Sequence, residues 1–274
     1  MSVEAPYPEL DEYLVWIGEA GWRISEIEAS EGSAGNISVC IGWPVEMRRK
    51  FPLAESLDLP LAVPELAGMT LVITGSGRRL RDVIQDPTAN LGCLVVDKGG
   101  QTGQLYTSPR RLFANLTSEL NSHLAVHRDQ IASSGSNFHA VVHAQPRHLT
   151  YLSHIPSYQD QTYLSQHLLR WQPETIINLP EGIGFVPFNV PGSQALMSAT
   201  LEMLHQYRVI VWAKHGVVAR SDTSVKRASD RIEYAETAAS YEYLDLVAGQ
   251  PGEGLSMDEI RAICKAFNIQ QSIC

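Results

Sequence analysis

Apolar and polar positions along this chain follow two periods. Apolar runs rich in β-branched residues predict strands at residues 35–42, 69–77, 92–97, 103–107, 139–144, 175–179 and 209–220. Apolar residues three or four positions apart predict helices at residues 7–23, 116–133, 165–171, 193–207 and 225–249. Because strands alternate with helices, the pattern predicts one α/β domain over residues 1–274, with helices covering both faces of a sheet.

Local signals predict how some of these elements begin and end. The apolar residues of the first helix, at roughly helical spacing, are Leu10, Leu14, Ile17 and Trp22. We expect a glycine to end this helix. The helix predicted within residues 116–133 should have Thr117 or Ser118 as its N-cap, because a hydroxyl side chain suits this position. Residues 43–67 carry prolines and mixed charges, so we expect a connection around short extended pieces.

Composition and charge limit the kinds of molecule that this chain is expected to bind. With 44% hydrophobic and 19% charged residues, the 274-residue chain is typical of a soluble globular protein with a sizeable core. A net charge of −9 argues against nucleic acid, because phosphate backbones are bound by clustered Lys and Arg. No apolar run has the length of a membrane span, and the stretch MSVEAPYPELDEY lacks the features of a signal peptide. We therefore expect a cytoplasmic protein with no membrane partner.

The cysteines predict neither a disulfide framework nor a thiolate metal site. Cys40, Cys93, Cys264 and Cys274 lie far apart and form no CxxC pair. This usage fits the reducing cytoplasm.

Two histidines lie where strands are expected to end. His143 closes the run HAVVHA, and His215 closes VIVWAKH and precedes a glycine. A lone histidine in this position is more often a satisfied core residue than a ligand. Two of them in one sheet could face the same cleft at the strand ends, where ligands collect. Glu119, in the first turn of its helix, could join them, although a carboxylate there is also explained by the helix dipole.

A metal site formed by residues of a single helix is an alternative to this long-range site. Glu119, His123 and His127 are spaced four apart on one predicted helix and share a face. We rank it below the long-range site, since a covered helix face can use histidines for packing.

Three turns could bind an anion. SAGNIS and TGSG carry glycines beside predicted strands, and TSE lies at a predicted helix N-terminus. Such segments expose backbone amides and hydroxyls. None matches a P-loop or a GxGxxG pattern, so a nucleotide is not indicated.

Taken together, these segments resemble the class II sugar-phosphate aldolases of the class II aldolase/adducin family. The segments that carry the resemblance, in order, are AGN, VITGSG, DPTANLG, TSELNSH, VVHAQPRH, LPEGIGFVPFNVPGS and VWAKHGV. They span nearly the whole chain, from about Leu10 to the last predicted helix. The resemblance is strongest to the members that cleave L-rhamnulose 1-phosphate, an activity of rhamnose catabolism.

The resemblance implies a fold, an assembly and a reaction. The fold would be a three-layer α/β/α sandwich around a mainly antiparallel sheet, assembled as a homotetramer with active sites between subunits. One Zn²⁺ per subunit would support retro-aldol cleavage of L-rhamnulose 1-phosphate to dihydroxyacetone phosphate and L-lactaldehyde. This lyase chemistry leaves an enediolate, whose charge a Lewis acid stabilises without a lysine Schiff base.

It also implies roles for individual residues. Glu119 would act as acid and base beside the metal, which His143 and His215 would help to bind, and Glu174 would be an acid contributed by the adjacent subunit. Positions matching the phosphate-binding turns are Ser33, Gly35, Asn36, Ser76, Gly77, Thr117 and Ser118. Ser33 stands where the family pattern has asparagine, and a shorter donor could reach a phosphate oxygen through water.

Gln145 departs from the family pattern. That pattern is HxH on one strand, which places both side chains on one face, whereas this chain has His143-Ala144-Gln145. Zinc prefers imidazole or thiolate ligands, so an amide oxygen should bind it more weakly and would suit a harder divalent ion better. Gln145 could be a weak ligand, His148 could replace it, or the metal site could be incomplete.

Two other functions stay open. An adducin-like scaffold domain would keep the fold without a metal, although the retained Glu119, Glu174, His143 and His215 argue against it. A different aldolase or epimerase of the superfamily would keep the phosphate turns and act on another sugar phosphate.

Overall fold

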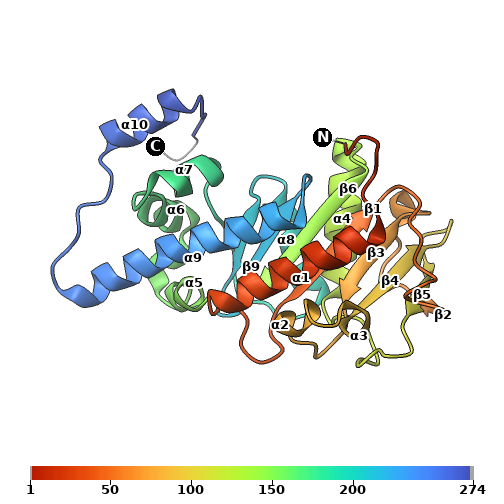
Figure 1. The fold of residues 1–274 in the computed structure, drawn as a ribbon. Helices are drawn as coiled ribbons and strands as arrows, with labels where there is room; N and C mark the ends of the chain where they lie inside the picture. Colours follow the sequence, from red (N-terminus) through yellow and green to blue (C-terminus); the bar gives the residue numbers. More distant parts are fainter. Residues whose placement is uncertain (1, 272–274) are drawn as a thin grey trace.

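The computed structural model describes residues 2–271. A nine-stranded sheet lies at the centre of the molecule (Figure 1). The strands are β1 (Asn36–Ile41), β2 (Leu53–Asp58), β3 (Thr70–Thr74), β4 (Leu91–Val96), β5 (Thr102–Thr107), β6 (Phe138–Ala144), β7 (Gly184–Val186), β8 (Val209–Trp212) and β9 (Gly216–Ser221). Their order is β2-β5-β4-β3-β1-β6-β9-β8-β7. Every neighbouring pair is antiparallel except β7 and β8. The mainly antiparallel sheet implied by the family resemblance is confirmed.

Helices cover both faces of this sheet. They are α1 (Leu10–Glu26), α2 (Leu80–Val83), α3 (Pro87–Asn90), α4 (Leu120–Ser134), α5 (Arg147–Leu152), α6 (Gln161–Leu169), α7 (Pro173–Asn178), α8 (Gln194–Leu204), α9 (Val225–Ala248) and α10 (Met257–Ala266), with short 3₁₀ turns at Pro64–Leu66 and Pro156–Gln159. Helices α1 and α9 lie across one face of the sheet, and α4 and α8 lie on the opposite face (Figure 1). None of the helices within residues 2–271 has the length and apolar character that a membrane span requires.

Strand β1 shows how the three layers are separated. Successive side chains of a strand point to opposite faces. Ile37, Val39 and Ile41 pack into the core beneath α1 and α9, while Cys40 packs into the core beneath α4. All six residues of β1 are buried, because helices cover both faces here. Ser38 therefore faces the α4 layer from inside a closed core.

The predicted end of the first helix is wrong. Helix α1 continues through Gly18 and Gly21 to Glu26. A Cβ on Gly21 would lie 2.7 Å from the Leu80 carbonyl oxygen, so this glycine serves close packing against α2. Trp22 is 43% exposed and lies off the buried face. The glycines therefore allow a close contact between helices and do not mark a helix end.

Two predicted strands also differ. Instead of the strand predicted at 175–179, residues 175–178 belong to α7 and Leu179 is its C-cap. Pro173 begins this helix, and Ile176 packs with Leu169 and Ile260. A short apolar run fits a strand and a buried helix equally well, which explains the error. The predicted strand at 209–220 is two strands, β8 and β9, joined by a turn at residues 213–215. His215 thus lies in a turn between two paired strands.

Two more predictions, on the N-cap of α4 and on the cysteines, can be compared with the structure. The N-cap of α4 is Glu119, not Thr117 or Ser118. Cys40, Cys93 and Cys264 are free, whereas Cys274 lies outside the described residues.

Candidate active site

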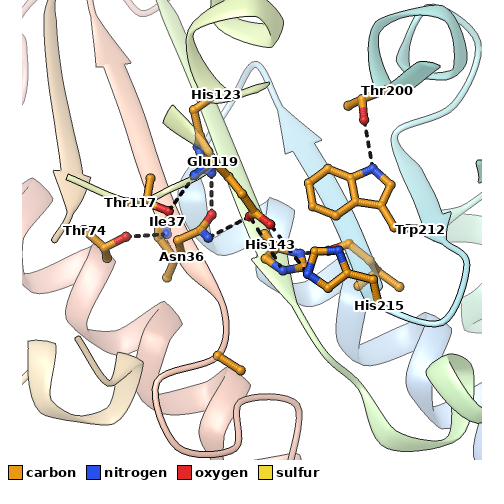
Figure 2. Close-up of polar contacts among 12 residues, drawn as sticks. Asn36, Ile37, Thr74, Thr117, Glu119, His123, His143, Thr200, Trp212 and His215 are labelled. Carbon is orange, nitrogen blue, oxygen red and sulfur yellow. Dashed lines mark hydrogen bonds and ion pairs between the residues drawn. The ribbon is translucent and has the colours of Figure 1, made fainter. Parts of the chain in front are cut away.

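Glu119, His143 and His215 converge at one point beside the central strands. Their ligand atoms all lie within 4.8 Å of one another, and no other group of three or more such residues is found within residues 2–271. Glu119 is the residue at the N-cap position of α4, His143 lies near the end of β6, and His215 lies in the β8–β9 turn. Figure 2 shows both imidazoles beside the carboxylate. The structure thus brings together the long-range set expected from the sequence.

The spacing of the donors fits a metal ion better than a direct hydrogen bond. His143 Nε2 is 3.7 Å from Glu119 Oε2, and His215 Nε2 is 3.5 Å from Glu119 Oε1. Hydrogen bonds of this type are shorter, at about 2.7–3.2 Å. Two ligands bound to zinc at about 2.0–2.1 Å in a tetrahedron stand roughly 3.3 Å apart. The three side chains therefore have the chemistry and the approximate spacing for a divalent cation.

The two histidines are held in place differently. His143 Nδ1 lies 2.9 Å from the Val217 carbonyl oxygen, which can only accept, so Nδ1 carries a proton and Nε2 is the nitrogen that faces Glu119. His215 stacks on Trp212, with ring centroids 5.2 Å apart and planes at 24°. Trp212 is in turn fixed by a 2.8 Å hydrogen bond from its Nε1 to Thr200 Oγ1 (Figure 2). Both imidazoles are thus oriented before any ligand binds.

The charges of the site favour an ionised carboxylate and a neutral imidazole. Burial by itself would raise the pKa of Glu119, but the neighbouring His143 and the hydrogen bond from Asn36 outweigh it and lower the pKa. Burial and the nearby His143 lower the pKa of His215. An ionised carboxylate and a neutral imidazole are the forms in which Glu119 and His215 bind a metal.

A cavity of about 180 Å³ opens above the three side chains. It is lined by all of the residues matched to phosphate-binding turns, namely Ser33, Gly35, Asn36, Ser76, Gly77, Thr117 and Ser118, and by Gln145 and Pro191. Ser33, Ser76 and Ser118 are exposed, while Glu119 and His143 are buried. No lysine or arginine within residues 2–271 lines it, so an anion there would depend on amides, hydroxyls and a bound cation.

Asn36 has a role that its turn motif did not indicate. Its Nδ2 donates to Glu119 Oε2 at 2.9 Å, and its Oδ1 accepts from His123 Nε2 (Figure 2). Both polar ends of the amide therefore already have protein partners. The side chain holds the carboxylate, which leaves the turn backbone and its serines for an anion.

The structure distinguishes between Gln145 and His148 as the residue that could replace the second histidine of the HxH pattern. Gln145 lines the cavity, and its Cγ lies 3.1 Å from where a Cβ on Gly216 would be. His148 is absent from the lining, and its Nδ1 is hydrogen-bonded to Glu236 Oε1 at 2.8 Å. Within this chain, Gln145 is thus the candidate near the donors.

The remaining expected site residues lie elsewhere. Glu174 is exposed on α7 and does not line the cavity of its own chain. His123 and His127 turn to Ser38, so they do not form a local site with Glu119. These placements leave Glu119, His143 and His215 as the cluster with free converging donors.

Sequence reasoning missed Gly216. A Cβ there would lie 2.3 Å from the Ala144 carbonyl oxygen and 3.1 Å from His143 Cε1, so only glycine lets β9 approach β6 at the site. The signal available was the glycine directly after His215.

Comparison with known proteins identifies the family. The model of the family described as "Class II Aldolase and Adducin N-terminal domain" matches residues 17–243. The chain belongs to this family. The match covers the carboxylate, both histidines and the turns that line the cavity.

Individual relatives extend the likeness over most of the chain. A rhamnulose-1-phosphate aldolase of Bacteroides thetaiotaomicron is 29% identical over 256 residues, covering 93% of this chain and 91% of the relative. One from Klebsiella pneumoniae is 29% identical over 214 residues, covering 78% and 76%. A sugar-phosphate aldolase structure from Thermotoga maritima matches with a TM-score of 0.73 at 28% identity, covering 89% of this chain and 99% of that one.

Proposed function

We propose that this protein is a metal-dependent aldehyde-lyase that cleaves L-rhamnulose 1-phosphate to dihydroxyacetone phosphate and L-lactaldehyde. The convergence of Glu119, His143 and His215 at the floor of a cavity rimmed by glycine and serine turns carries this proposal. The named activity of the Bacteroides and Klebsiella relatives supports the choice of substrate.

The chain supplies binding groups for both ends of such a substrate. Ser76 and Gly77 after β3, and Thr117 and Ser118 before α4, would hold the phosphate at the cavity mouth. Glu119, His143 and His215, with Gln145 as a weaker fourth ligand, would hold one divalent ion, which Zn²⁺ fits. That ion, when bound, would stabilise the negative charge that develops on the ketone fragment.

Two carboxyl groups would move protons in the reaction. The hydroxyl on C4 gives its proton to Glu174 of a neighbouring subunit, the C3–C4 bond breaks, and C4 becomes the aldehyde carbon of lactaldehyde. The bonding electrons remain on the C1–C3 fragment as an enediolate. Glu119, which is ionised at rest, takes a proton from solvent in the cavity and delivers it to C3 to complete dihydroxyacetone phosphate, and Glu174 returns its proton to solvent. Glu119 is buried beside the cavity and is held by Asn36, so it is the base and acid at C3.

Glu174 would serve the aldehyde oxygen from a neighbouring subunit. It is exposed in its own chain, which permits a role across an interface. We propose a homotetramer with the active sites between subunits.

The decisive assay measures dihydroxyacetone phosphate released from L-rhamnulose 1-phosphate. Purified protein is tested as prepared, after chelation, and after zinc, cobalt or manganese is added back. Activity that chelation removes and metal restores is the expected result. L-Fuculose 1-phosphate is tested in parallel, because preference for it would replace the proposed substrate by another sugar phosphate. Absence of both bound metal and turnover would favour a scaffold role.

A further inference from the structure

A row of buried polar side chains extends from the candidate site into the core beneath α4. Glu119 Oε2 accepts from Asn36 Nδ2 at 2.9 Å, and Asn36 Oδ1 accepts from His123 Nε2. His123 Nδ1 lies 2.6 Å from Ser38 Oγ. All four residues are at least 92% buried, with exposed fractions of 8%, 4%, 2% and 0% for Asn36, Glu119, His123 and Ser38.

The row continues through two more histidines. Ser38 Oγ lies 2.7 Å from His127 Nε2, and His127 Nδ1 lies 2.9 Å from His139 Nδ1. His139 Nε2 is buried and has no hydrogen-bond partner among the described residues. The proposed reaction uses none of these three imidazoles, although buried polar groups of this kind are costly unless they are satisfied.

The direction of the first bonds follows from the chemistry of Glu119. An ionised carboxylate only accepts, so Asn36 must present its Nδ2 to Glu119 and its Oδ1 to His123. His123 must then carry its proton on Nε2. The imidazole is neutral, because burial lowers the pKa of His123 to about 3. Its Nδ1 is therefore an acceptor and takes the single proton of Ser38 Oγ.

The same logic sets the inner bonds. Since Ser38 donates to His123, it must accept from His127, which then carries its proton on Nε2. Burial lowers the pKa of His127 well below its ordinary value, so its Nδ1 is unprotonated and accepts from His139 Nδ1. Burial and the charge of Arg220 lower the pKa of His139 to about 3, which keeps this ring neutral too.

We infer that Asn36, His123, Ser38, His127 and His139 form a one-way hydrogen-bond chain whose donors all point toward Glu119 and fix the orientation of its carboxylate. If the Asn36 amide rotated by 180°, its Nδ2 would face the His123 Nε2–H and its Oδ1 would face the carboxylate, so both contacts would become repulsive. The inner residues stabilise the His123 tautomer that opposes this rotation, because the Ser38 hydroxyl donates to His123 Nδ1. They are positioning residues, and this role in catalysis depends on the proposed function.

The tautomers can be measured without any activity. In ¹⁵N magic-angle-spinning NMR of histidine-labelled protein, the expected protonated nitrogens are Nε2 of His123, Nε2 of His127 and Nδ1 of His139. Assignment uses the resonance lost in each single His→Gln variant. The opposite tautomer at His123 or His127, or a charged imidazole at pH 7, would overturn the chain.

Cutting the chain tests whether it positions Glu119. Ser38→Ala removes the central hydroxyl, and we expect kcat to fall about 10- to 100-fold with KM unchanged, the usual scale for groups that orient a metal-site ligand. Ser38→Thr keeps a hydroxyl and should restore most of kcat. Ser165→Ala is the matched control, because Ser165 is also a buried serine with two hydrogen bonds, both to Ile183.

The outcomes separate the two proposals. Expected tautomers in a protein that does not cleave the sugar phosphate would uphold the chain and reject the proposed substrate. A Ser38→Ala protein with the kcat of the unmodified protein, or with a loss equal to that of Ser165→Ala, would reject positioning.

Discussion

Mild acid should destabilise this protein strongly through its buried histidines. His123 and His139 have pKa values lowered to about 3, mainly by burial, against an ordinary value near 6.5. Between these values the unfolded chain binds protons that the folded chain cannot accept. Stability is therefore complete above about pH 6.5 and is lost as the pH falls toward 3.

The size of the loss follows from linkage. For one group shifted from about 6.5 to about 3, lowering the pH from 7 to 5 costs roughly 2 kcal/mol of unfolding free energy. His123 and His139 together give about 4 kcal/mol, and His127 adds to it in the same direction. Domains are typically stable by about 5–15 kcal/mol, so this loss is a large fraction. Glu119 does not contribute over this interval, because a carboxyl with a lowered pKa loses its stabilisation only below its ordinary value, about 4.5.

Urea unfolding at pH 7, 6 and 5, followed by far-ultraviolet circular dichroism at one protein concentration, measures this loss. A chelator is kept in every sample so that metal release adds nothing. His139→Gln should reduce the pH dependence by roughly 2 kcal/mol. The control His154→Gln changes an exposed histidine and should leave it unaltered. A loss under about 1 kcal/mol between pH 7 and 5 would refute neutral burial of the histidines.

Three further predictions concern the site and the packing. Glu119→Gln should abolish turnover while substrate binding, measured by calorimetry, is largely retained, and an active variant would refute the proton-transfer role. Gln145→His should tighten zinc binding in a competition titration with a chromogenic chelator, whereas unchanged affinity would mean that another residue fills the position. Gly21→Ala should lower the free energy of unfolding by about 1–3 kcal/mol, because the new Cβ would meet the Leu80 carbonyl oxygen, while Gly99→Ala, which has open space, should not.

Much of the central sheet was predictable from the sequence because its strands are covered on both faces. Strands β1 and β6 are buried throughout and are rich in apolar, often β-branched residues, which predicts strands in spite of a few polar positions. The edge strand β2 has mostly exposed residues and therefore no comparable signal. The antiparallel order came only from the family resemblance, since periodicity does not report strand direction.

The site was predictable in part for similar reasons. His143 and His215 were visible as histidines that close apolar runs. Their placement made a joint site with Glu119 one candidate, and the resemblance favoured it. The hydrogen-bond chain was not visible, because Ser38 and His139 look like ordinary strand residues until the β1–β6 pairing and α4 bring them together. Hydrogen-bond direction depends on neighbours distant in the sequence, which no local pattern records.

The residues of the candidate site lie far apart in the sequence, and this separation affects how the protein folds. Asn36 and Glu119 are 83 residues apart, and His143 contacts Val217 across 74 residues. Pairings of such long range close late and slow the folding of a domain. The metal ligands His143 and His215 are brought together by the pairing of β6 with β9, so we expect a cation to bind after that pairing has formed. In a refolding experiment, recovery of metal affinity would accordingly follow the slowest phase.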